Sequence, residues 1–544
     1  MISRRRTINF LIASPLALQG GCGRNSAPSL KSENAKLGAT LEWARGFDGQ
    51  RVADRGDGTF LNPIFAGDYP DPSIIKDGDA YYLTFSSFDA YPGLLIWRSK
   101  DLVNWAPIAP ALHSPIGSVW APDLTKHDGR YYLYIPARTP TYKSIYVIHA
   151  DSVEGPWSEP VDLHLPDHID PCHVVGEDGR RYLFLSNGDM IALADDGLST
   201  IGDVRHVYDP WRYPDEWDVE CFCPEGPKIT RRGDWFYMLT AVGGTAGPPT
   251  GHMVIAARSK SVFGPWEDAP NNPQVRTQSR DDQWWSRGHA TLVEGIADDD
   301  WWLVYHGYEM DFWTLGRQCL LDPVRWREDG WFEAVGGDLS APLEKPAGNN
   351  SSSEKPPPHG MPLSDDFVAP ELKPHWAFYQ PEAREYDRIA LGFGALRLTA
   401  KGRSPADASP LCFVSGDLSY EVQVEIERDP GAVAGLLLFY NKRLYCGFGF
   451  DDGGAIMHRY GQERRIGNHL PEGVRNLSIK IRNDQHIVTM HTSLDGSAWK
   501  KFDVQIETSG YHHNVAYDFL SLRPAIYAAG VGAARFRNLE YRGL

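Results

Sequence analysis

A short pattern of polar and apolar positions recurs five times in the first two thirds of the chain. Each copy is a polar turn followed by an aromatic-rich apolar run, as in "HDGRYYLYIPA" and "EDGRRYLFLSN". Such a pattern predicts a tight turn that leads into a buried strand. The aligned copies place five apolar residues at equivalent positions and at similar intervals along the chain: Leu83, Leu133, Leu183, Met238 and Leu303. Because strand repeats of ~50 residues are typical of β-propellers, the sequence predicts five blades.

The last third of the chain has a different pattern. The stretch "EKPAGNNSSSEKPPPHG" has almost nothing apolar to bury and predicts a linker over residues 344–361. Beyond it, runs such as "SYEVQVEIE" and "NLSIKIRND" alternate between apolar and polar positions, which predicts an antiparallel β-sandwich. We therefore expect an all-β protein with a propeller over residues 60–343, after an extension over 23–59, and a sandwich over 362–544.

The first 22 residues have the pattern of an export signal. Three arginines at positions 4–6 precede an apolar stretch from Ile8 to Leu18, and small residues follow before Cys22. Eleven apolar residues are too few to span a bilayer core of ~30 Å. The arginines resemble a twin-arginine signal, and Cys22 resembles a lipoprotein acceptor, although Gln19 stands where an aliphatic residue is usual. We expect an exported protein that is periplasmic, anchored to the cell envelope through a lipid on Cys22, or secreted.

Composition narrows the class of partner. The formal net charge of -17 argues against nucleic acid, and 18 Trp with 25 Tyr favour aromatic-lined surfaces that suit a neutral polymer. Besides Cys22 there are six cysteines, which could pair in 15 ways after export. Cys221 and Cys223 in "CFCPEG" are only a weak metal-binding signal, because no second pair matches them.

Five polar residues occur at nearly the same phase of the five repeats, each shortly before the aligned apolar position: Asp71, Asp123, Asp170, Glu225 and His289. Taken singly, each is best explained as a turn or cap residue. In a propeller, however, one phase of every blade is the innermost strand, and these strands surround one axis. The set in register therefore predicts a site on the axis.

Converging carboxylates repel one another, so their pKa values separate into one ionised base and one protonated acid. That combination suits hydrolysis of a glycosidic bond. Trp120 lies beside the same axis, where it could stack on a sugar or belong to the core. Arg287 and Arg317 precede and follow the last repeat, and Arg317 is the stronger candidate because apolar and aromatic residues surround it.

Several motifs in order resemble glycoside hydrolase family 43, close to its β-xylosidase-like members. They run from about Asn62 to Trp326 and include "NPIFAGDYPDPSII", "VWAPDL", "EGPKI", "SRGHATLVEG" and "LGRQCLLDPVRW". The downstream sandwich, with "LSLRPAIYAAG" near its end, resembles the concanavalin-like accessory domain of such enzymes. The resemblance implies an inverting exo-glycosidase on a five-bladed propeller. It implies that Asp71 is the general base, Glu225 the general acid, and Asp170 a third carboxylate that orients the acid and raises its pKa.

Further positions follow from the same resemblance. Arg317 matches an arginine that contacts the terminal sugar, and Phe88 and Trp120 match aromatic wall positions. His289 matches a histidine that helps to hold a metal ion or water on the axis. No cofactor is expected for the chemistry, and a structural calcium ion could occupy the axis. Cys172 and the "CFC" stretch depart from the common pattern and leave the sugar preference open.

The expected activity is release of terminal pentose from xylan-derived oligosaccharides. A β-D-xylosidase comes first, an α-L-arabinofuranosidase second and a galactan-directed exo-glycosidase third. A carbohydrate-binding propeller without catalysis is the alternative from another class, and the presence of both Asp71 and Glu225 argues against it. The sandwich could be a glycan-binding module or a lid that narrows the pocket.

Overall fold

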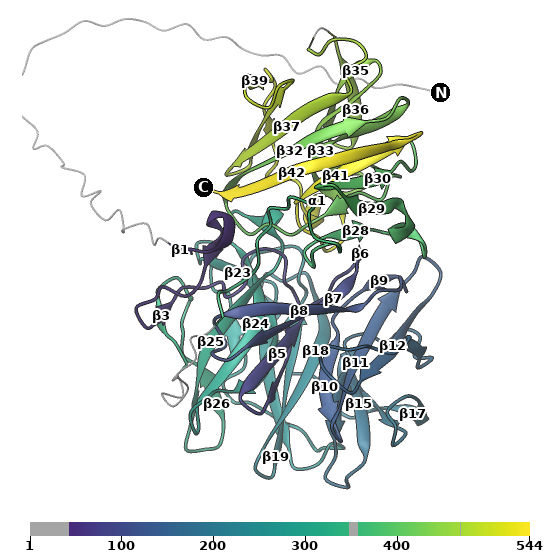
Figure 1. The fold of residues 1–544 in the computed structure, drawn as a ribbon. Coiled ribbons are helices and arrows are strands. Elements are labelled where there is room, and N and C mark those ends of the chain that lie inside the picture. Colours follow the sequence, from purple (N-terminus) through teal and green to yellow (C-terminus); the bar gives the residue numbers. More distant parts are fainter. Residues whose placement is uncertain (1–42, 347–356, 468) are drawn as a thin grey trace, which may run out of the picture. The chain divides into compact units, whose positions relative to one another are not determined.

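The computed structural model describes residues 43–346, 357–467 and 469–544. The predictions for the export signal and Cys22, and for most of the linker, lie outside these residues. Within the described ranges the regular structure is almost entirely β, and the α-helix found there, α1 (His513–Ala516), has four residues (Figure 1). No helix in these ranges is long and apolar enough to cross a membrane. The predicted all-β class is confirmed.

Five antiparallel sheets, each with a core of four strands, form the blades of a propeller. The first blade contains β4 (Ser73–Asp77), β5 (Ala80–Thr84), β7 (Gly93–Ser99) and β8 (Trp105–Leu112). The second contains β10 (Asp123–His127), β11 (Arg130–Arg138), β12 (Lys143–Ala150) and β13 (Val161–Asp162), with β9 (Ser118–Val119) beside β11. The third contains β14 (Cys172–Val175), β15 (Arg181–Leu185), β16 (Asp189–Leu193) and β17 (Thr200–His206).

The fourth blade contains β18 (Cys221–Arg232), β19 (Trp235–Gly243), β20 (Met253–Ser259) and β21 (Glu267–Asp268), with β22 (Val275–Arg276) beside β20. The fifth contains β23 (Trp284–Glu294), β24 (Trp301–Glu309), β25 (Gln318–Trp326) and β26 (Phe332–Ala334). The aligned apolar residues of the repeat all fall on the second strand of a blade and are at most 1% exposed. The recurring turn and buried run therefore corresponds to the first hairpin of each blade. The prediction of five blades is confirmed.

The ring closes because the start of the propeller pairs with its last blade. Asn62 exchanges two side-chain hydrogen bonds with the backbone of Leu321 on β25, each of 2.9 Å. Next to it, Phe65 forms a bridge with Cys319. The short strand β3 (Thr59–Phe60) pairs with β27 (Leu343–Glu344), which follows the fifth blade. The segment before the first blade is thus held against the fifth blade and the strand that follows it. These contacts close the ring of blades.

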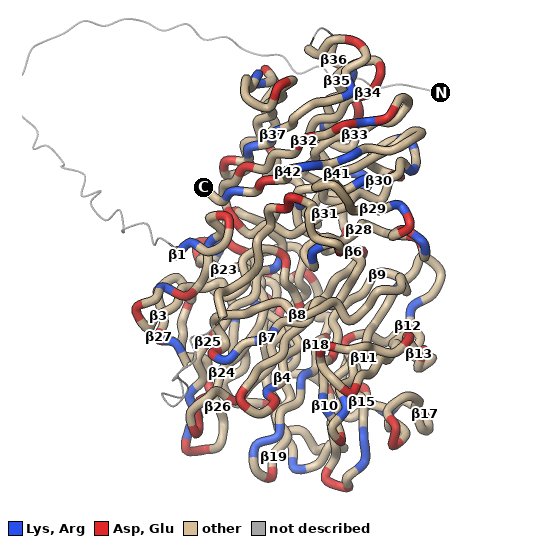
Figure 2. The backbone as a smooth tube through the Cα atoms, in the orientation of Figure 1, with Lys and Arg blue, Asp and Glu red and all other residues tan. Residues whose placement is uncertain are grey.

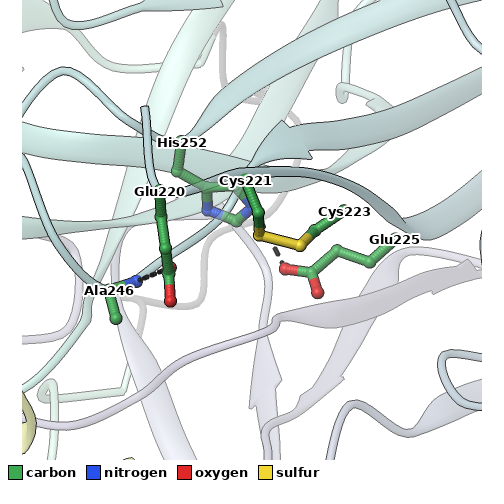
Figure 3. The surroundings of a disulfide bond; sticks show 6 residues. All are labelled: Glu220, Cys221, Cys223, Glu225, Ala246 and His252. Carbon is green, nitrogen blue, oxygen red and sulfur yellow. Dashed lines mark hydrogen bonds and ion pairs between the residues drawn. A yellow bond between two sulfur atoms is a disulfide. The ribbon is translucent and has the colours of Figure 1, made fainter. Parts of the chain in front are cut away.

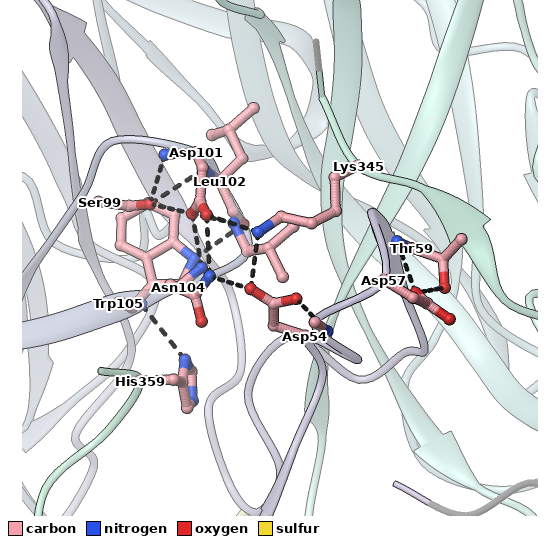
Figure 4. A network of polar contacts seen from close by, with 12 residues as sticks. Asp54, Asp57, Thr59, Ser99, Asp101, Leu102, Asn104, Trp105, Lys345 and His359 are labelled. Carbon is pink, nitrogen blue, oxygen red and sulfur yellow. Dashed lines mark hydrogen bonds and ion pairs between the residues drawn. The ribbon is translucent and has the colours of Figure 1, made fainter. Parts of the chain in front are cut away.

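A polar network fastens both described ends of the linker to the propeller (Figure 4). Lys345 lies 2.7 Å from Asp54 and 2.9 Å from Asp101, and Asn104 donates to Asp54. His359, on the far side of the segment 347–356, accepts a hydrogen bond from the backbone of Trp105. The chain therefore leaves the propeller and returns to it along the first blade.

Two sheets form the C-terminal sandwich. The first orders β36 (Gln462–Ile466), β35 (Gly454–Arg459), β34 (Leu444–Asp451), β33 (Ala432–Asn441), β41 (Arg523–Gly530), β31 (Leu411–Cys412), β28 (Ala377–Tyr379) and β6 (Ala90–Tyr91). The second orders β29 (Ile389–Gly392), β30 (Ala395–Thr399), β42 (Ala533–Gly543), β32 (Ser419–Arg428), β37 (Asn476–Asp484), β38 (Ile487–Ser493) and β39 (Lys500–Lys501), with β40 (Ile506–Glu507) beside β38. Buried and more exposed residues alternate along β32, as its sequence predicts.

One strand of the first sandwich sheet comes from the propeller. β6 follows the second strand of the first blade, and its Tyr91 pairs with Phe378 on β28. The loop that carries Phe88 therefore continues directly into the sandwich sheet. Figure 2 shows that acidic and basic residues are interspersed along the chain.

Candidate active site

Asp71 is the centre of a buried polar cluster. It lies just before β4, and its side chain is 7% exposed. Its Oδ1 is 2.9 Å from Arg317 Nη1, and its Oδ2 accepts a 2.6 Å hydrogen bond from the Ser86 hydroxyl. Two imidazoles complete the surroundings, with Nδ1 of His306 at 3.2 Å and Nδ1 of His289 at 3.4 Å from Oδ1. Every contact comes from a different part of the chain, so the fold assembles the cluster.

These contacts decide the charge of Asp71. Burial alone would raise the pKa of its carboxyl, but the Arg317 guanidinium beside it holds that pKa well below its ordinary value. The carboxylate is therefore ionised at neutral pH and keeps acceptor sites for a water molecule.

Three residues at the shared phase of the repeats adopt the same uncommon backbone conformation. Asp71, Asp170 and His289 have φ values of 55°, 55° and 57°. This left-handed region is costly for residues other than glycine and persists where the surrounding structure fixes it. The repeat phase seen in the sequence thus corresponds to a backbone turn that directs a side chain toward the interior.

Glu225 lies on β18, where the strand is irregular. Its side chain is 24% exposed, and its Oε1 lies 3.2 Å from Nε2 of His252. Burial is the main cause that raises the pKa of Glu225, to about 8, and the negative charges of Asp71 and Glu220 add to it, whereas Arg317 opposes it. At neutral pH Glu225 is therefore a protonated acid beside an ionised carboxylate.

Asp170 supports Glu225 from the neighbouring blade. Its Oδ2 accepts a 2.9 Å hydrogen bond from the backbone of Gly226, the residue after Glu225. Burial, and then the charges of Glu225 and Asp71, raise the pKa of Asp170 well above its ordinary value. Three carboxyl groups in one buried site therefore hold fewer than three negative charges at neutral pH.

A pair of histidines connects Asp71 with Glu225. His306 Nδ1 accepts a 3.1 Å hydrogen bond from the backbone N–H of Asp71, so the proton of its neutral ring is on Nε2. His306 Nε2 is 3.2 Å from His252 Nδ1, which leaves the proton of His252 on Nε2, facing Glu225. Burial lowers the pKa of both imidazoles to about 3, so they are neutral. The two neutral histidines thus lie between the carboxyl groups, and His252 approaches Glu225 without a hydrogen bond to it.

Asp123 has a different role from the other members of the set. Its Oδ1 accepts a 2.7 Å hydrogen bond from Lys228, and its Oδ2 accepts one of 2.8 Å from the backbone of His173. Asp123 lies on the second blade, His173 on the third and Lys228 on the fourth, so these hydrogen bonds hold blades together. Of the five residues at the shared phase, four therefore meet around the acid and base, and Asp123 belongs to the packing.

Aromatic residues beside Arg317 line an open cleft. The Arg317 guanidinium lies 5.4 Å from the ring of Phe88 and 5.2 Å from the ring of Phe519. Both rings and Trp120 line a cleft of about 770 Å³. Trp120 is partly buried, and Arg138 lies over its indole at 5.7 Å. The sandwich supplies Phe519 and, from α1 and the residues around it, much of one wall of the cleft.

The sandwich also holds the segment that carries Arg317. This segment includes η3 (Trp313–Leu315), and the backbone of Leu522 donates a 2.8 Å hydrogen bond to Thr314. Arg523 pairs with Asp68 at 2.8 Å, and Asp68 Oδ1 in turn accepts a hydrogen bond from the backbone of Arg317. The position of Arg317 therefore depends on residues of both domains.

Arg287 was the weaker of the two arginine candidates. Its hydrogen bonds are made with residues other than the acid and base. Its guanidinium donates a 2.9 Å hydrogen bond to the backbone of Gly337 and a 2.5 Å hydrogen bond to the backbone of Arg276. The side chain is buried among the loops of the last two blades. Arg287 therefore serves packing, and Arg317 is the arginine of the site.

Cys221 and Cys223 form a disulfide bond shortly before Glu225 (Figure 3). The metal-binding signal of this pair was weak in the sequence, and both sulfur atoms are used in the bond. Two of the six cysteines that could pair therefore do so. The remaining cysteines of the described residues, at positions 172, 319, 412 and 446, are free and buried.

Several residues of the site were not predicted from the sequence. His252, His306, Ser86, Asp68 and Phe519 lie outside the shared phase of the repeats. His306 offered one usable signal, since it is a polar residue inside the apolar run "WWLVYHGYE" and is fully buried. Phe519 offered none, because its place in the cleft depends on a contact with another domain.

Comparison with known proteins agrees with this geometry. A model of the glycosyl hydrolases family 43 matches residues 60–332, and one described as a beta-xylosidase C-terminal concanavalin A-like domain matches residues 364–542. A xylan 1,3-beta-xylosidase of Vibrio is 29% identical over 70% of this chain and 77% of its own length. A non-reducing end alpha-L-arabinofuranosidase of Bacteroides ovatus is 33% identical over 62% of this chain and 65% of its own.

Solved structures show the same arrangement. A family-43 protein of Bacillus licheniformis superposes with a TM-score of 0.78 at 25% identity, over 89% of this chain and 100% of that one. A xylan beta-1,4-xylosidase of Bacillus halodurans gives a TM-score of 0.76 at 25% identity, over 89% and 99%. The propeller and the concanavalin-like sandwich therefore occur together in these structures.

Proposed function

The chain belongs to glycosyl hydrolase family 43, and on that premise we propose that it is an exo-acting, inverting glycosidase that releases terminal pentose from plant cell-wall oligosaccharides. β-D-Xylosidase is the activity that we place first. The observation that carries the proposal is the pairing of an ionised Asp71 with a protonated Glu225 in one buried site beside an open cleft. Such a pair supplies both proton transfers of glycoside hydrolysis.

In the proposed reaction, the Asp71 carboxylate accepts a proton from a water molecule as the water oxygen attacks the anomeric carbon. Glu225 donates its proton to the glycosidic oxygen as the bond to the leaving sugar breaks. Asp71 ends protonated and Glu225 ionised, and exchange with solvent restores both. Because water attacks from the face opposite the leaving group, the product has the inverted configuration.

The remaining residues position the substrate. Arg317 contacts the terminal sugar, while Phe88 and Trp120 form walls of its pocket. Asp170 orients the acid through the hydrogen bond that it accepts from the backbone of Gly226, whereas burial and the charges of Asp71 and Glu220 raise the pKa of Glu225. The sandwich acts as a lid rather than as a separate glycan-binding module, because Phe519 and α1 close one side of the cleft. A wall on that side would favour attack on chain ends, which is the exo action proposed here.

The second candidate is an α-L-arabinofuranosidase, which the Bacteroides ovatus relative supports by its name. A galactan-directed exo-glycosidase is third. The acid and base support hydrolysis of a glycosidic bond but do not distinguish among these three sugars, because they act on the bond that breaks and not on the rest of the sugar ring. A propeller that only binds carbohydrate has no need of the separated pKa values.

Hydrolysis of three nitrophenyl glycosides by the purified protein tests the proposal: β-xyloside, α-arabinofuranoside and β-galactoside. We expect the highest kcat/KM on the β-xyloside, and proton NMR of the first product should show α-xylose. A higher value on the arabinofuranoside would replace the first candidate by the second. Inactivity on all three would overturn the assignment, and β-xylose as the first product would overturn inversion.

A metal ion at His289 receives little support from the donor set. The Nε2 of His289 is buried and has no protein partner, so it offers one ligand. The described residues contain no group of three His, Cys, Asp or Glu side chains that could hold a metal ion, and calcium prefers six to eight oxygen ligands. We therefore assign no step to a metal ion.

We also propose export, on the strength of the arginines at positions 4–6 and the apolar stretch that follows. Lipid attachment at Cys22 and simple cleavage remain the two forms of this proposal. Labelling of expressing cells with radioactive palmitate would distinguish them. Incorporation that disappears in Cys22→Ala supports a lipid anchor, and an unlabelled, shortened chain supports cleavage.

A further inference from the structure

The disulfide between Cys221 and Cys223 spans an irregularity in β18. In the pairing with β19, Cys221 lies opposite Gly243 and Glu225 lies opposite Ala241. The chain therefore advances by four residues on β18 and by two on β19 between these two pairs. The two extra residues are accommodated between Cys221 and Glu225, and the disulfide closes this bulge (Figure 3). Bulges beside active sites change the direction in which a side chain points.

The bulge carries a carboxyl group at each end. Glu220 precedes it, and its Oε2 accepts a 2.7 Å hydrogen bond from the backbone of Ala246. Glu225 follows it and faces His252 (Figure 3). Glu220 lines the cleft, and Cys223 is exposed. The disulfide therefore lies in the segment between a residue of the cleft and Glu225.

Two features show why a bulge here needs a constraint. Cys223 is exposed and has a φ of 34°, which lies in the left-handed region that non-glycine residues rarely adopt. Unpaired residues within a strand also lack the ladder hydrogen bonds that would otherwise fix them. A covalent link between positions 221 and 223 removes much of this freedom directly before Glu225.

We propose that the Cys221–Cys223 disulfide is a positioning element for the general acid, which fixes the bulge so that the Glu225 carboxyl stays directed at the leaving-group oxygen. This inference rests on the proposed role of Glu225. It goes beyond that role, because it assigns a function to a pair of cysteines that the hydrolytic chemistry itself does not use.

The inference predicts a dependence on the leaving group. Nitrophenolate departs with little protonation, whereas a sugar alkoxide requires the acid. Loss of the disulfide should therefore lower kcat on xylobiose by about 10-fold or more, since small misplacements of a catalytic group have effects of that order. The loss on nitrophenyl β-xyloside should be several-fold smaller, and KM should change little on either substrate.

The full-length protein is tested in two ways. Dithiothreitol reduces the disulfide to two thiols by two electrons and is itself oxidised to its cyclic disulfide; the other described cysteines are already free and buried. The double variant Cys221→Ser/Cys223→Ser removes the bond permanently. Both should give the same ratio of losses on the two substrates. Air oxidation after removal of dithiothreitol should restore the wild-type protein but not the variant.

Three controls separate positioning from general stability. In Glu225→Gln, which has no acid to position, dithiothreitol should cause no further loss of kcat. Thermal unfolding should show both forms folded at the assay temperature. Mass spectrometry of an unreduced digest should find the peptide with Cys221 and Cys223 lighter by two hydrogen atoms, and a peptide of full mass would overturn the proposal.

The remaining outcomes are equally decisive. Equal losses on both substrates, or no loss on xylobiose, would overturn the positioning role and leave the proposed function intact. If the wild-type protein prefers another sugar, the corresponding disaccharide and nitrophenyl glycoside replace the xylosides. A wild-type protein inactive on every nitrophenyl glycoside would overturn the proposed function, and this inference with it.

Discussion

Asp71 and Asp123 occupy the same phase of two neighbouring repeats, yet they have different partners. Asp71 faces Arg317 and two histidines, whereas Asp123 neutralises the buried Lys228. We expect Asp71→Asn to lower kcat per folded molecule by at least ~10²-fold, because it removes the proposed base. It also leaves the buried Arg317 guanidinium without its nearest counter-charge, so some loss of stability should accompany the loss of kcat. Asp123→Asn leaves an ammonium group buried without its counter-charge and should lower the free energy of unfolding by roughly 3 to 5 kcal/mol. Urea denaturation and kcat per folded molecule distinguish the two; similar kcat values would contradict the assignment.

The proposed role of Glu225 as the acid predicts an alkaline limit of activity. Its acid form exists below its raised pKa of about 8, so kcat/KM should fall as pH rises through that value. Glu220 is one cause of the raised pKa. Glu220→Gln removes that negative charge and should move the alkaline limb of the pH profile to lower pH. Glu216→Gln, an exposed change in the preceding loop, is the control and should leave the profile unchanged. A limb that moves upward in Glu220→Gln would show that the charge acts in the opposite sense.

At the scale of elements, glycine permits β18 to turn at the site. Gly226 has a φ of +62°, and a Cβ there would lie 2.9 Å from the His289 ring. Gly233, in the turn that leads to β19, has a φ of +60° but nothing within 4 Å of a Cβ. Alanine at either position should destabilise the protein by about 1 to 2 kcal/mol through the left-handed conformation. Only Gly226→Ala should also lower kcat, by about 10-fold or more, because it displaces the residue next to Glu225. Equal kcat values in the two variants would contradict this explanation.

At the scale of the whole molecule, residues of both domains meet at the candidate active site. Asp68 in the propeller and Arg523 in the sandwich are paired, with side chains 2% and 11% exposed. Arg523→Met should lower the free energy of unfolding by roughly 3 to 5 kcal/mol, since it leaves a buried carboxylate without its partner. It should also lower kcat, because Asp68 holds the backbone of Arg317.

The control for this prediction is Arg542→Met, at an exposed sandwich arginine that pairs with Glu421. It should cost no more than ~1 kcal/mol. Adding Asp68→Asn to Arg523→Met removes the uncompensated charge and should recover part of the stability, although not full kcat. A single Arg523→Met variant as stable and active as the control would show that the sandwich does not hold Arg317.

Features that depend on neighbouring residues could be predicted from the sequence alone. Turn residues followed by apolar runs identified the hairpin of each blade, and their recurrence identified the number of blades, because strand burial and turn chemistry are local. The shared phase selected Asp71, Asp170, Glu225 and His289, and all four meet. Their convergence could be predicted because the repeats place equivalent residues on equivalent strands.

Features that depend on distant residues emerged only in the folded chain. Folding separated Asp123 from the other members of the set, and it brought in His252, just before β20, and His306 on β24. It set which carboxyl is ionised, since burial and the position of Arg317 fix that balance. It also placed Phe519 of the sandwich opposite Phe88 of the propeller. No local pattern encodes such contacts, because they arise only when two domains pack and exclude water from the groups between them.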